Sequence, residues 1–284
     1  KTVSDLEQQA NIKINSAYIT ITGKQVTIVQ NSIVKEAKDK IAGITAKDLN
    51  SALLQIKDID VPSDKVIIDI ITNEIKLDNG KIVDNPVGTL SSTFTINGQV
   101  ILANRSYVKQ LTGILKRANL EIDGIIPNIL AQRTLVLDKN EINDNIMILD
   151  IGAGNTDIGV FNGQSYIYAN TIPLGGENIT SDIALVFNIT EEEAEKLKKQ
   201  YSLALRSFID NDTDIILNTY KGSEKNKTIK SSQLIEVMEA RIEEIFNLVN
   251  KQITNAGIKQ NINNVVLTGQ GITCISKSDV AGKI

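Results

Sequence analysis

The sequence predicts a mixed α/β protein in which sheets are flanked by helices. Short strand patterns alternate with amphipathic helical patterns along the 284 residues, without the plain βαβαβ rhythm of a doubly wound sheet. Apolar residues make up 42% of the chain and charged residues 23%, which is ordinary for a protein that folds around a core. A chain of this length is long enough for about two domains, each with a core of its own.

The composition excludes several classes of protein. Thirty basic residues against 34 acidic ones give a net charge of −4, so nothing points to a nucleic-acid partner. With no histidine and a single cysteine, Cys274, the chain lacks the residues for zinc sites, histidine-based triads and internal disulfides. No apolar run approaches the ~18 residues of a spanning helix, and no signal peptide is recognisable. We therefore expect a cytoplasmic protein whose chemistry uses carboxylates, lysines, hydroxyls and backbone groups.

The first third of the chain predicts a helix end over 1–10 and an alternating strand over 17–23. A second strand pattern follows at 24–33. Thr45 then has the character of a helix N-cap, because a threonine hydroxyl can accept a bond from the first turn. The helix that it opens carries three apolar residues on one face: Leu49, Leu53 and Ile56.

Two hairpins and a helix are predicted next. Segment 65–83 has two strand patterns around Asn79-Gly80, which is a strong signal for a two-residue turn. Asn97-Gly98 predicts a second turn of the same kind. An amphipathic helix is expected over 106–122, followed by a strand and a helix over 122–137. The inward residues of the first helix are expected to be Val108, Leu111, Leu115 and Leu120.

The second half begins with a strand meander over 146–172 that turns at Asn162-Gly163. Helices are predicted over 179–187 and 190–205, and the polar stretch 207–230 is predicted to be an exposed loop. A long amphipathic helix should occupy 232–255, with its apolar face formed by Leu234, Met238, Ile242, Ile245, Phe246, Val249 and Ile253.

The most unusual stretch is "ILDIGAGNTDIGVF", residues 148–161, where glycines and acids interrupt two apolar runs. A calcium loop would need a bidentate acid at its twelfth position, which is Phe161, and flanking helices in place of strands. A dinucleotide fingerprint would need a helix after the glycines, and here a strand follows. A purely structural hairpin remains open as the plain interpretation.

A phosphate-binding hairpin explains this stretch better. Gly152 and Gly154 let the backbone approach an anion and point successive N–H groups inward, and Thr156 can add a hydroxyl donor. Asp150 would repel a bare phosphate, so we assign it to the hydration shell of a Mg²⁺ ion carried by a nucleotide.

Three further motifs are weak when taken singly. "VVLTGQG" (265–271) is a buried strand that enters a glycine turn, for which an ordinary strand-to-helix turn is the simpler interpretation. Glu195 and Lys198 share a helical face and could be a solvated surface pair, or could hold the ribose and base of a nucleotide. "IPLGGENIT" (172–180) predicts a turn into a helix, or alternatively a hinge or a phosphate-side contact.

Taken together and in this order, the four motifs resemble the ATPase superfamily of actin, heat-shock chaperones and sugar kinases, in which two lobes bind ATP between them. The stretches "ILDIGAGNTDIGVF", "IPLGGENITSDIALVFNIT", "AEKLKKQYSLAL" and "NVVLTGQGI" look most like the bacterial cell-division FtsA family. So do "AYITITGK", "DNPVGTLSS" and "LIEVMEARIEEIFNLVNKQI". The likeness covers essentially the whole chain and implies an actin-like two-lobed α/β fold with an inserted small α+β subdomain.

The resemblance also implies a map of subdomains. The first-lobe core would be 1–23 with 94–147, and the inserted subdomain 24–93. The second-lobe core would be 148–189 with 262–284, and its upper subdomain 190–261. Both ends would be incomplete, because the family's first phosphate loop and its C-terminal membrane-binding amphipathic helix have no counterpart in this sequence.

For the site, the resemblance implies ATP and Mg²⁺, with Glu195 and Lys198 at the ribose and base. Gln270 stands where a third glycine is common in the family. The implied nucleotide-binding residues are Asp150 (also metal and water ordering), Gly152, Ala153, Gly154, Asn155, Thr156, Gly175, Gly176, Glu195, Lys198, Gly269, Gln270 and Gly271.

The implied function is an ATP-binding protein that polymerises and links the ring of the tubulin-like protein FtsZ to the cytoplasmic membrane. Its partners would be the FtsZ C-terminal tail, further copies of itself and other division proteins, on the inner face of the membrane at the division site. ATP hydrolysis would be weak at most, since no residue is an obvious tuned base. Two alternatives stay open on the same fold: an ATP-dependent small-molecule kinase or phosphatase, and a pilus or secretion assembly protein.

Overall fold

The computed structural model divides the chain into two compact units, each described here by itself. Unit 1 comprises Lys1–Leu135 with Phe161–Ala169, and unit 2 comprises Val136–Val160 with Asn170–Ile284. The structure describes residues 2–38, 42–138, 141, 144–201, 203–217 and 227–273.

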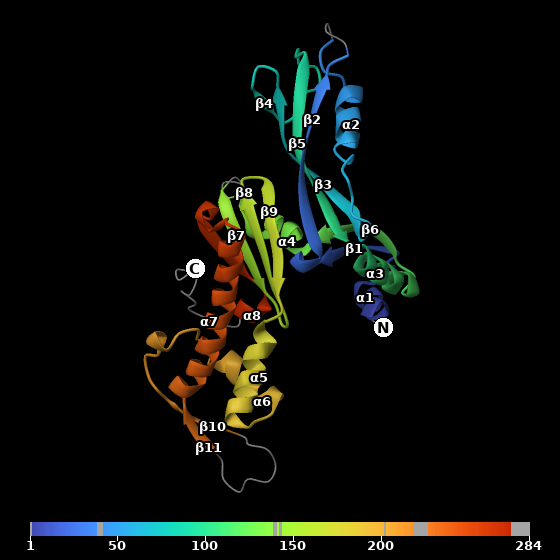
Figure 1. Ribbon diagram of the computed structural model, residues 1–284. Coiled ribbons are helices and arrows are strands. Elements are labelled where there is room, and N and C mark those ends of the chain that lie inside the picture. The colour runs from blue at the N-terminus through green and yellow to red at the C-terminus, as the bar shows by residue number, and fades with distance from the viewer. Residues whose placement is uncertain are drawn as a thin grey trace. The chain divides into compact units, whose positions relative to one another are not determined.

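Unit 1 contains a four-stranded antiparallel sheet of order β2-β5-β3-β4, with α2 along one face (Figure 1). Its elements are β2 (Val26–Glu36), α2 (Ala46–Gln55), β3 (Lys65–Leu77), β4 (Ile82–Val83) and β5 (Thr93–Asn104). Thr45 caps α2 as predicted, and its hydroxyl and the Asp48 carboxylate form a reciprocal capping box. Of the three predicted inward residues of α2, Ile56 is fully buried in the core of this sheet, while Leu49 and Leu53 pack against it.

The predicted turn at Asn79-Gly80 is confirmed, but the one at Asn97-Gly98 is wrong. β5 runs straight through Asn97 and Gly98, which pair with β2 on one side and β3 on the other. A Cβ at Gly98 would lie 2.9 Å from the Ile71 carbonyl oxygen and 2.9 Å from Ile56 Cδ1. Glycine is therefore needed here because neighbouring atoms come close.

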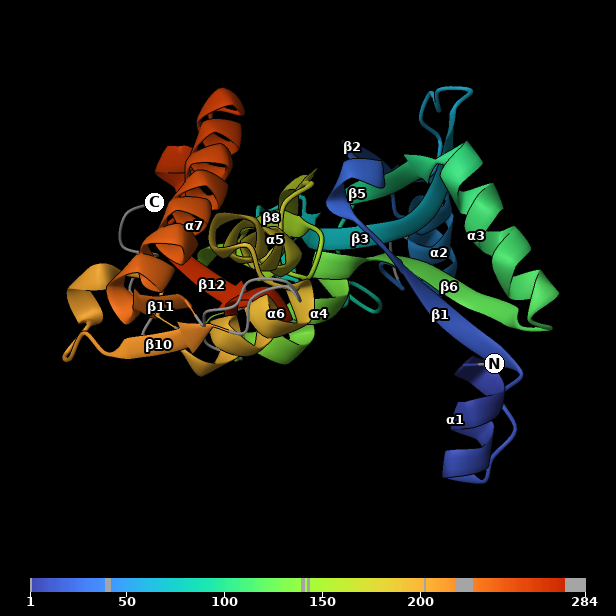
Figure 2. The ribbon, with the colours of Figure 1, turned by 90° about the horizontal axis from the view of Figure 1, so that it is seen from below.

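The rest of unit 1 is built on a parallel pair of strands, β1 (Ser16–Ile21) and β6 (Glu121–Pro127). The two strands lie side by side in Figure 2, together with α1 (Thr2–Ala10) and α3 (Arg105–Arg117). The helix expected over 106–122 ends at Arg117, so Leu120 lies beyond it and residues 121–122 already belong to β6. The other three residues of the expected apolar face are half-buried, and α3 has no fully buried residue. α4 (Asn128–Val136) follows β6 directly, as predicted.

A third sheet, of order β12-β7-β8-β9, contains the predicted meander. Its strands are β7 (Asn145–Ile151), β8 (Thr156–Asn162), β9 (Ser165–Ile172) and β12 (Asn264–Thr268), with β12 parallel to β7. The tip of the β8–β9 hairpin is grouped with unit 1, where the buried Gln99 amide binds both the N–H (2.9 Å) and the carbonyl (2.7 Å) of Tyr166. The remaining strand residues belong to unit 2.

Unit 2 adds helices and a small hairpin to that sheet. α7 (Ser231–Asn255) runs beside the sheet in Figure 1, and Asn170 of β9 donates to Gln252 of α7. All seven apolar residues predicted for this helix face are buried. The other elements are α5 (Gly176–Phe187), α6 (Glu191–Gln200), β10 (Asp214–Leu217), β11 (Lys227–Lys230) and α8 (Gln270–Thr273), with short 3₁₀ turns at Gly23–Gln25, Arg206–Phe208 and Lys259–Asn261.

Two predictions in this unit need correction. The helix expected over 190–205 ends at Gln200, and the stretch expected as a loop over 207–230 contains the antiparallel strands β10 and β11. Alternate residues of these strands, Ile215, Leu217 and Ile229, are buried, so a two-residue period of apolar side chains was hidden among polar neighbours. Residues 218–226, within the predicted loop, and Cys274 lie outside the described residues.

Candidate functional site

The predicted phosphate loop is the short connection between β7 and β8. The Gly152 N–H donates to the Asn155 carbonyl at 2.9 Å and closes the loop. Ala153, Gly154 and Asn155 are exposed, and a Cβ at Gly154 would have ordinary space, since the nearest atom, Glu177 Oε2, would be 3.7 Å away. The loop therefore presents a small, open backbone surface.

The first turn of α5 holds this loop in place. The Gly176 N–H donates to the Gly152 carbonyl at 2.9 Å, and the Glu177 N–H donates to the Ala153 carbonyl at 2.8 Å. At the preceding position, the Gly175 N–H donates to the Asn178 side chain at 2.8 Å. The loop and the Pro-Leu-Gly-Gly turn, which are separate motifs in the sequence, are thus one hydrogen-bonded structure.

Three backbone segments meet behind the loop so closely that there is no room for a side chain at Gly175, Gly269 or Gly271. A Cβ at Gly271 would lie 2.5 Å from the Gly152 carbonyl oxygen, and one at Gly175 would lie 2.5 Å from that of Ala153. A Cβ at Gly269, whose φ is +93°, would lie 2.3 Å from Asp150 Oδ1. We call residues 151–153, 175–176 and 269–271 the glycine junction. Contacts within the protein account for these glycines.

Of the two polar residues that flank the loop, Thr156 differs from its predicted position as an exposed donor, and Asp150 does not. Thr156 is fully buried, and its hydroxyl donates to the Leu174 carbonyl at 2.8 Å. This bond ties the end of the loop to the segment that precedes α5. Asp150 lies at the end of β7, opposite Thr268 of β12 and against Gly269, and is half-buried. No cluster of three or more acidic, histidine or cysteine residues suited to a metal ion occurs within the described residues.

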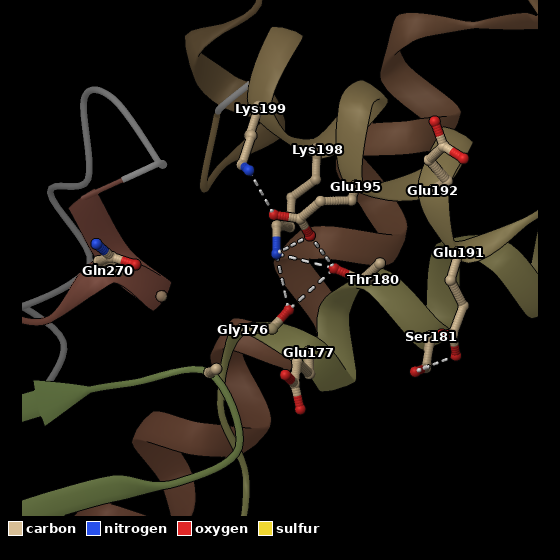
Figure 3. A pocket seen from close by; sticks show the side chains of 12 residues that line it. Gly176, Glu177, Thr180, Ser181, Glu191, Glu192, Glu195, Lys198, Lys199 and Gln270 are labelled. Carbon is tan, nitrogen blue, oxygen red and sulfur yellow. Dashed lines mark hydrogen bonds and ion pairs between the residues drawn. The ribbon is translucent and has the colours of Figure 1, made fainter. Parts of the chain in front are cut away.

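A pocket of about 470 Å³ opens beside the glycine junction, between α5, α6 and α8 (Figure 3). Six predicted site residues line it: Ala153, Gly176, Glu195, Lys198, Gln270 and Gly271. It is also lined by Glu177, Thr180, Ser181, Glu191, Glu192 and Lys199, which were not predicted. The other predicted residues, Asp150, Gly152, Gly154, Asn155, Thr156, Gly175 and Gly269, belong to the loop and junction next to it.

Glu195 and Lys198 are not a solvated surface pair. Lys198 is 4% exposed, and its ammonium binds Glu195 Oε2 at 2.6 Å, the Thr180 hydroxyl at 2.8 Å and the Gly176 carbonyl at 3.0 Å. The Thr180 hydroxyl also lies 2.5 Å from Glu195 Oε2. These bonds join α6 to the first turn of α5.

The environment of Glu195 keeps its carboxylate ionised. Burial raises its pKa, but hydrogen bonds from Lys198, Thr180 and Lys199 outweigh the burial and lower the pKa to about 2. Thr180 could have been predicted, because it lies four residues after Gly176 on the same turn-to-helix motif. Lys199 could not have been predicted, because in the sequence a second lysine next to Lys198 cannot be told from an ordinary surface lysine of the helix.

A second hollow of about 350 Å³ lies between α5 and α7. Its apolar lining includes Leu185, which is 82% exposed, and Val186. At one edge Asp182 binds the Arg241 guanidinium through both carboxylate oxygens, at 2.6 and 2.9 Å. The pair raises the pKa of Arg241 further, so its charge is fixed. This groove has an apolar lining, and at its rim Arg241 is paired with both Asp182 and Glu244, next to a further acid, Glu236.

Comparisons with known proteins match two stretches of the chain to family descriptions, and both descriptions name FtsA. Residues 147–274 match the model described as "Cell division protein FtsA", and residues 23–102 match "SHS2 domain inserted in FTSA". The chain is 28% identical over 269 residues to cell division protein FtsA of Bacillus subtilis (strain 168), covering 95% of this chain and 61% of that protein. It is 27% identical over 279 residues to the FtsA protein of Escherichia coli (strain K12), covering 95% and 65%. The chain thus spans less than two thirds of these relatives.

Solved structures show the same fold. The "PilM-PilN type IV pilus biogenesis complex" matches with a TM-score of 0.58 and 15% identity, over 99% of this chain and 70% of that one. "MreB5 of Spiroplasma citri bound to ADP" matches with a TM-score of 0.52 and 21% identity, over 63% and 57%. The fold is therefore a mixed α/β actin-like fold with an SHS2 insertion. Among the described helices, none has the length and hydropathy of a membrane span.

Proposed function

Because the chain belongs to the FtsA cell-division family, we propose that it binds Mg²⁺-ATP in the pocket beside the glycine junction and acts in cell division as an assembling adaptor. The observation that carries the proposal is the convergence of four separate sequence motifs on one pocket of unit 2. A volume of about 470 Å³ is within the range of small-molecule sites. The relative MreB5 of Spiroplasma citri was solved with ADP and with AMPPNP, which supports an adenine nucleotide.

The residues fit a nucleotide with its phosphates at the loop and its nucleoside in the pocket. Ala153, Gly154 and Asn155 offer exposed backbone to the phosphates, and the space over Gly154 is of the kind that a close-lying anion needs. Glu195, Lys198 and Gln270 line the part that would hold the ribose and base. Mg²⁺ would neutralise phosphate charge, with the Asp150 carboxylate orienting its water shell.

Nucleotide binding would serve assembly more than catalysis. We expect at most slow ATP hydrolysis, with Asp150 as the residue that orders metal and water. ATP would favour polymerisation of the protein, and the filament would join the FtsZ ring to the inner face of the cytoplasmic membrane and recruit later division proteins. The membrane contact would come from the C-terminal amphipathic helix that the resemblance implies for the family.

The groove between α5 and α7 is our candidate for the FtsZ C-terminal tail. The resemblance assigns the tail to the upper subdomain, about 190–261, which supplies the α7 wall of the groove. Leu185 and Val186 would contact apolar residues of the tail. A pilus-assembly role has only the fold in its favour, since that relative is 15% identical.

Calorimetric titration of ATP into the protein, with Mg²⁺ and with chelator, tests the nucleotide proposal. We expect Asp150→Asn to remove the gain in affinity that Mg²⁺ gives, because its uncharged amide does not orient the ion's water shell as a carboxylate does. Asp144→Asn, at the exposed opposite end of β7, is the matched control and should bind as the wild type does. Equal Mg²⁺ dependence in wild type and Asp150→Asn would refute the metal role. Transfer of phosphate from ATP to a small molecule would favour the kinase alternative.

Fluorescence polarisation of a labelled FtsZ tail peptide tests the partner. Leu185→Asp should weaken binding about tenfold or more, because it places a charge in the apolar centre of the groove. Leu54→Asp, at an exposed leucine of α2 in unit 1, is the control. Equal affinities of both variants and wild type would place the tail elsewhere.

A further inference from the structure

The sequence contains three Asn-Gly pairs: Asn79-Gly80, Asn97-Gly98 and Asn162-Gly163. Such pairs are chemically labile, because glycine has no side chain to hinder its backbone nitrogen from attacking the side-chain carbonyl carbon of the asparagine. The attack closes a succinimide ring and releases ammonia. It requires an asparagine side chain that is free to turn and a glycine N–H that is not held in a hydrogen bond.

The sheet of unit 1 protects Asn97-Gly98. The Asn97 side chain donates to Glu74 Oε1 at 2.7 Å and accepts from the Ser32 hydroxyl at 2.7 Å. Gly98 is buried and pairs with β2 on one side and with β3 on the other. Ring closure here would break both side-chain bonds and disrupt the strand between them.

Asn79-Gly80 is exposed, but its turn engages both reacting groups. The Gly80 N–H donates to the Leu77 carbonyl at 2.9 Å, and the Asn79 side chain accepts from the Lys81 N–H at 3.0 Å. The turn must therefore open before the ring can close.

Asn162-Gly163 has neither kind of protection. Asn162 is exposed at the end of β8, and Gly163 begins the turn into β9. Within the described part of the chain, the Asn162 side chain and the Gly163 N–H take part in no hydrogen bond. The turn is held through its carbonyls instead, because Arg133 donates to Gly163 at 2.7 Å and to Gln164 at 3.3 Å. The nearby guanidinium charge also favours the deprotonated glycine nitrogen that attacks.

We propose that Asn162-Gly163 is a site of spontaneous deamidation that loosens the β8–β9 turn. The Gly163 nitrogen forms a bond to the Asn162 side-chain carbonyl carbon, and the amide nitrogen leaves as ammonia with the proton that Gly163 gives up. Water then opens the ring at either carbonyl and yields aspartate or isoaspartate. Isoaspartate adds a methylene to the main chain before Gly163, so the carbonyls of Gly163 and Gln164 no longer both reach Arg133. This chemistry is independent of the proposed nucleotide site.

Peptide mapping by mass spectrometry, after the folded protein has aged in mildly alkaline heavy-oxygen water, tests the site. Asn97 and Asn162 both stand in the tripeptide Asn-Gly-Gln, so they are matched in local sequence. Asn162 should take up heavy oxygen roughly fivefold faster than Asn79, whose glycine must first give up a hydrogen bond, and Asn97 should be the slowest. In urea the three rates should become similar. The proposal is overturned if Asn79 or Asn97 keeps pace with Asn162 in the folded protein, or if the advantage of Asn162 persists in urea.

Two variants test the loosening of the turn. Aged wild type should melt a few degrees below fresh protein and should exchange the amide hydrogens of residues 163–169 faster. Freshly prepared Asn162→Asp has the aspartate product without the longer main chain, and it should melt as fresh wild type does. Asn162→Gln should resist ageing, because the larger ring closes more slowly. An equal loss of melting temperature in aged Asn162→Gln, or none in aged wild type that carries isoaspartate, would contradict the proposed effect on the turn.

Discussion

In the sheet of unit 1, Gly80 and Gly98 both follow an asparagine, yet the protein needs the two glycines for different reasons. Gly80 has a φ of +84° in the turn between β3 and β4, and its Cβ position is nearly empty. Gly98 lies inside β5, where a Cβ would meet the Ile71 carbonyl oxygen and Ile56. The first requirement comes from the local backbone, and the second comes from residues distant in the sequence.

Unit 2 repeats this contrast at the candidate nucleotide site. Gly154 has ordinary space around its Cβ position, whereas a Cβ at Gly271 would lie 2.5 Å from one carbonyl oxygen and 2.6 Å from another. A glycine-rich motif can therefore mix residues that pack the protein with residues that face a ligand. Of the loop and junction glycines, Gly154 is the one whose bare Cα is best explained by a ligand.

The largest effect should come from Gly271→Ala. Although Gly271 lies in α8, where alanine is locally favoured, the collision with Gly152 and Ile151 should win, and we expect a loss of about 2 kcal/mol or more of unfolding free energy. Gly154→Ala should change the unfolding free energy by less than about 0.5 kcal/mol, and it should still lower the affinity for ATP. Urea denaturation and calorimetry measure both quantities. Similar stability losses in the two variants would remove the contrast between packing and binding glycines.

An intermediate effect is expected at the two Asn-Gly sites, where the order of the variants matters more than their size. Alanine should cost about 1–2 kcal/mol at Gly80, through the left-handed backbone, and about 1–3 kcal/mol at Gly98, through overpacking. Asparagine should be milder than alanine at Gly80, since it tolerates left-handed φ, and worse than alanine at Gly98, since it is larger. Chemical denaturation of the four variants checks this reversal. The same order at both sites would mean that one cause operates at both.

The smallest effect concerns two glutamates of α6. The folded-state pKa of Glu195 is about 2, below its ordinary value of 4.5, so its stabilising contribution is complete above pH 4.5 and is lost as the pH falls toward 2. Glu195→Gln should remove part of that acid-dependent loss of melting temperature. Glu192→Gln should alter it little, because Glu192 forms an exposed pair with Lys196 in the same helix. Identical pH profiles for Glu195→Gln and wild type would show that the buried network adds no pH-dependent stability.

Local signals in the sequence were sufficient for much of the fold. The Thr45 cap, the Asn79-Gly80 turn and the apolar face of α7 depend on residues close to one another along the chain, and all three predictions are confirmed. The strand through Asn97-Gly98 was missed because its pairing with β2 and β3 overrides a local turn preference.

The candidate site was predictable in its residue types but less so in its roles. The order of the motifs identified which segments would meet, and six of the predicted residues line one pocket. Neither the burial of Lys198 nor the bracing by Thr156 could be read from the sequence, because both depend on how α5 packs against its neighbours.

The bonds from α5 to the loop also have an electrical consequence. The N-terminus of a helix carries about half a positive charge on its N–H groups, and here the first two of these groups donate to the carbonyls of Gly152 and Ala153. Each of those carbonyls shares a peptide unit with the next N–H, of Ala153 or Gly154, and accepting a hydrogen bond polarises that unit. The macrodipole of α5 is thereby extended by one peptide layer, and its positive end is presented at the exposed loop.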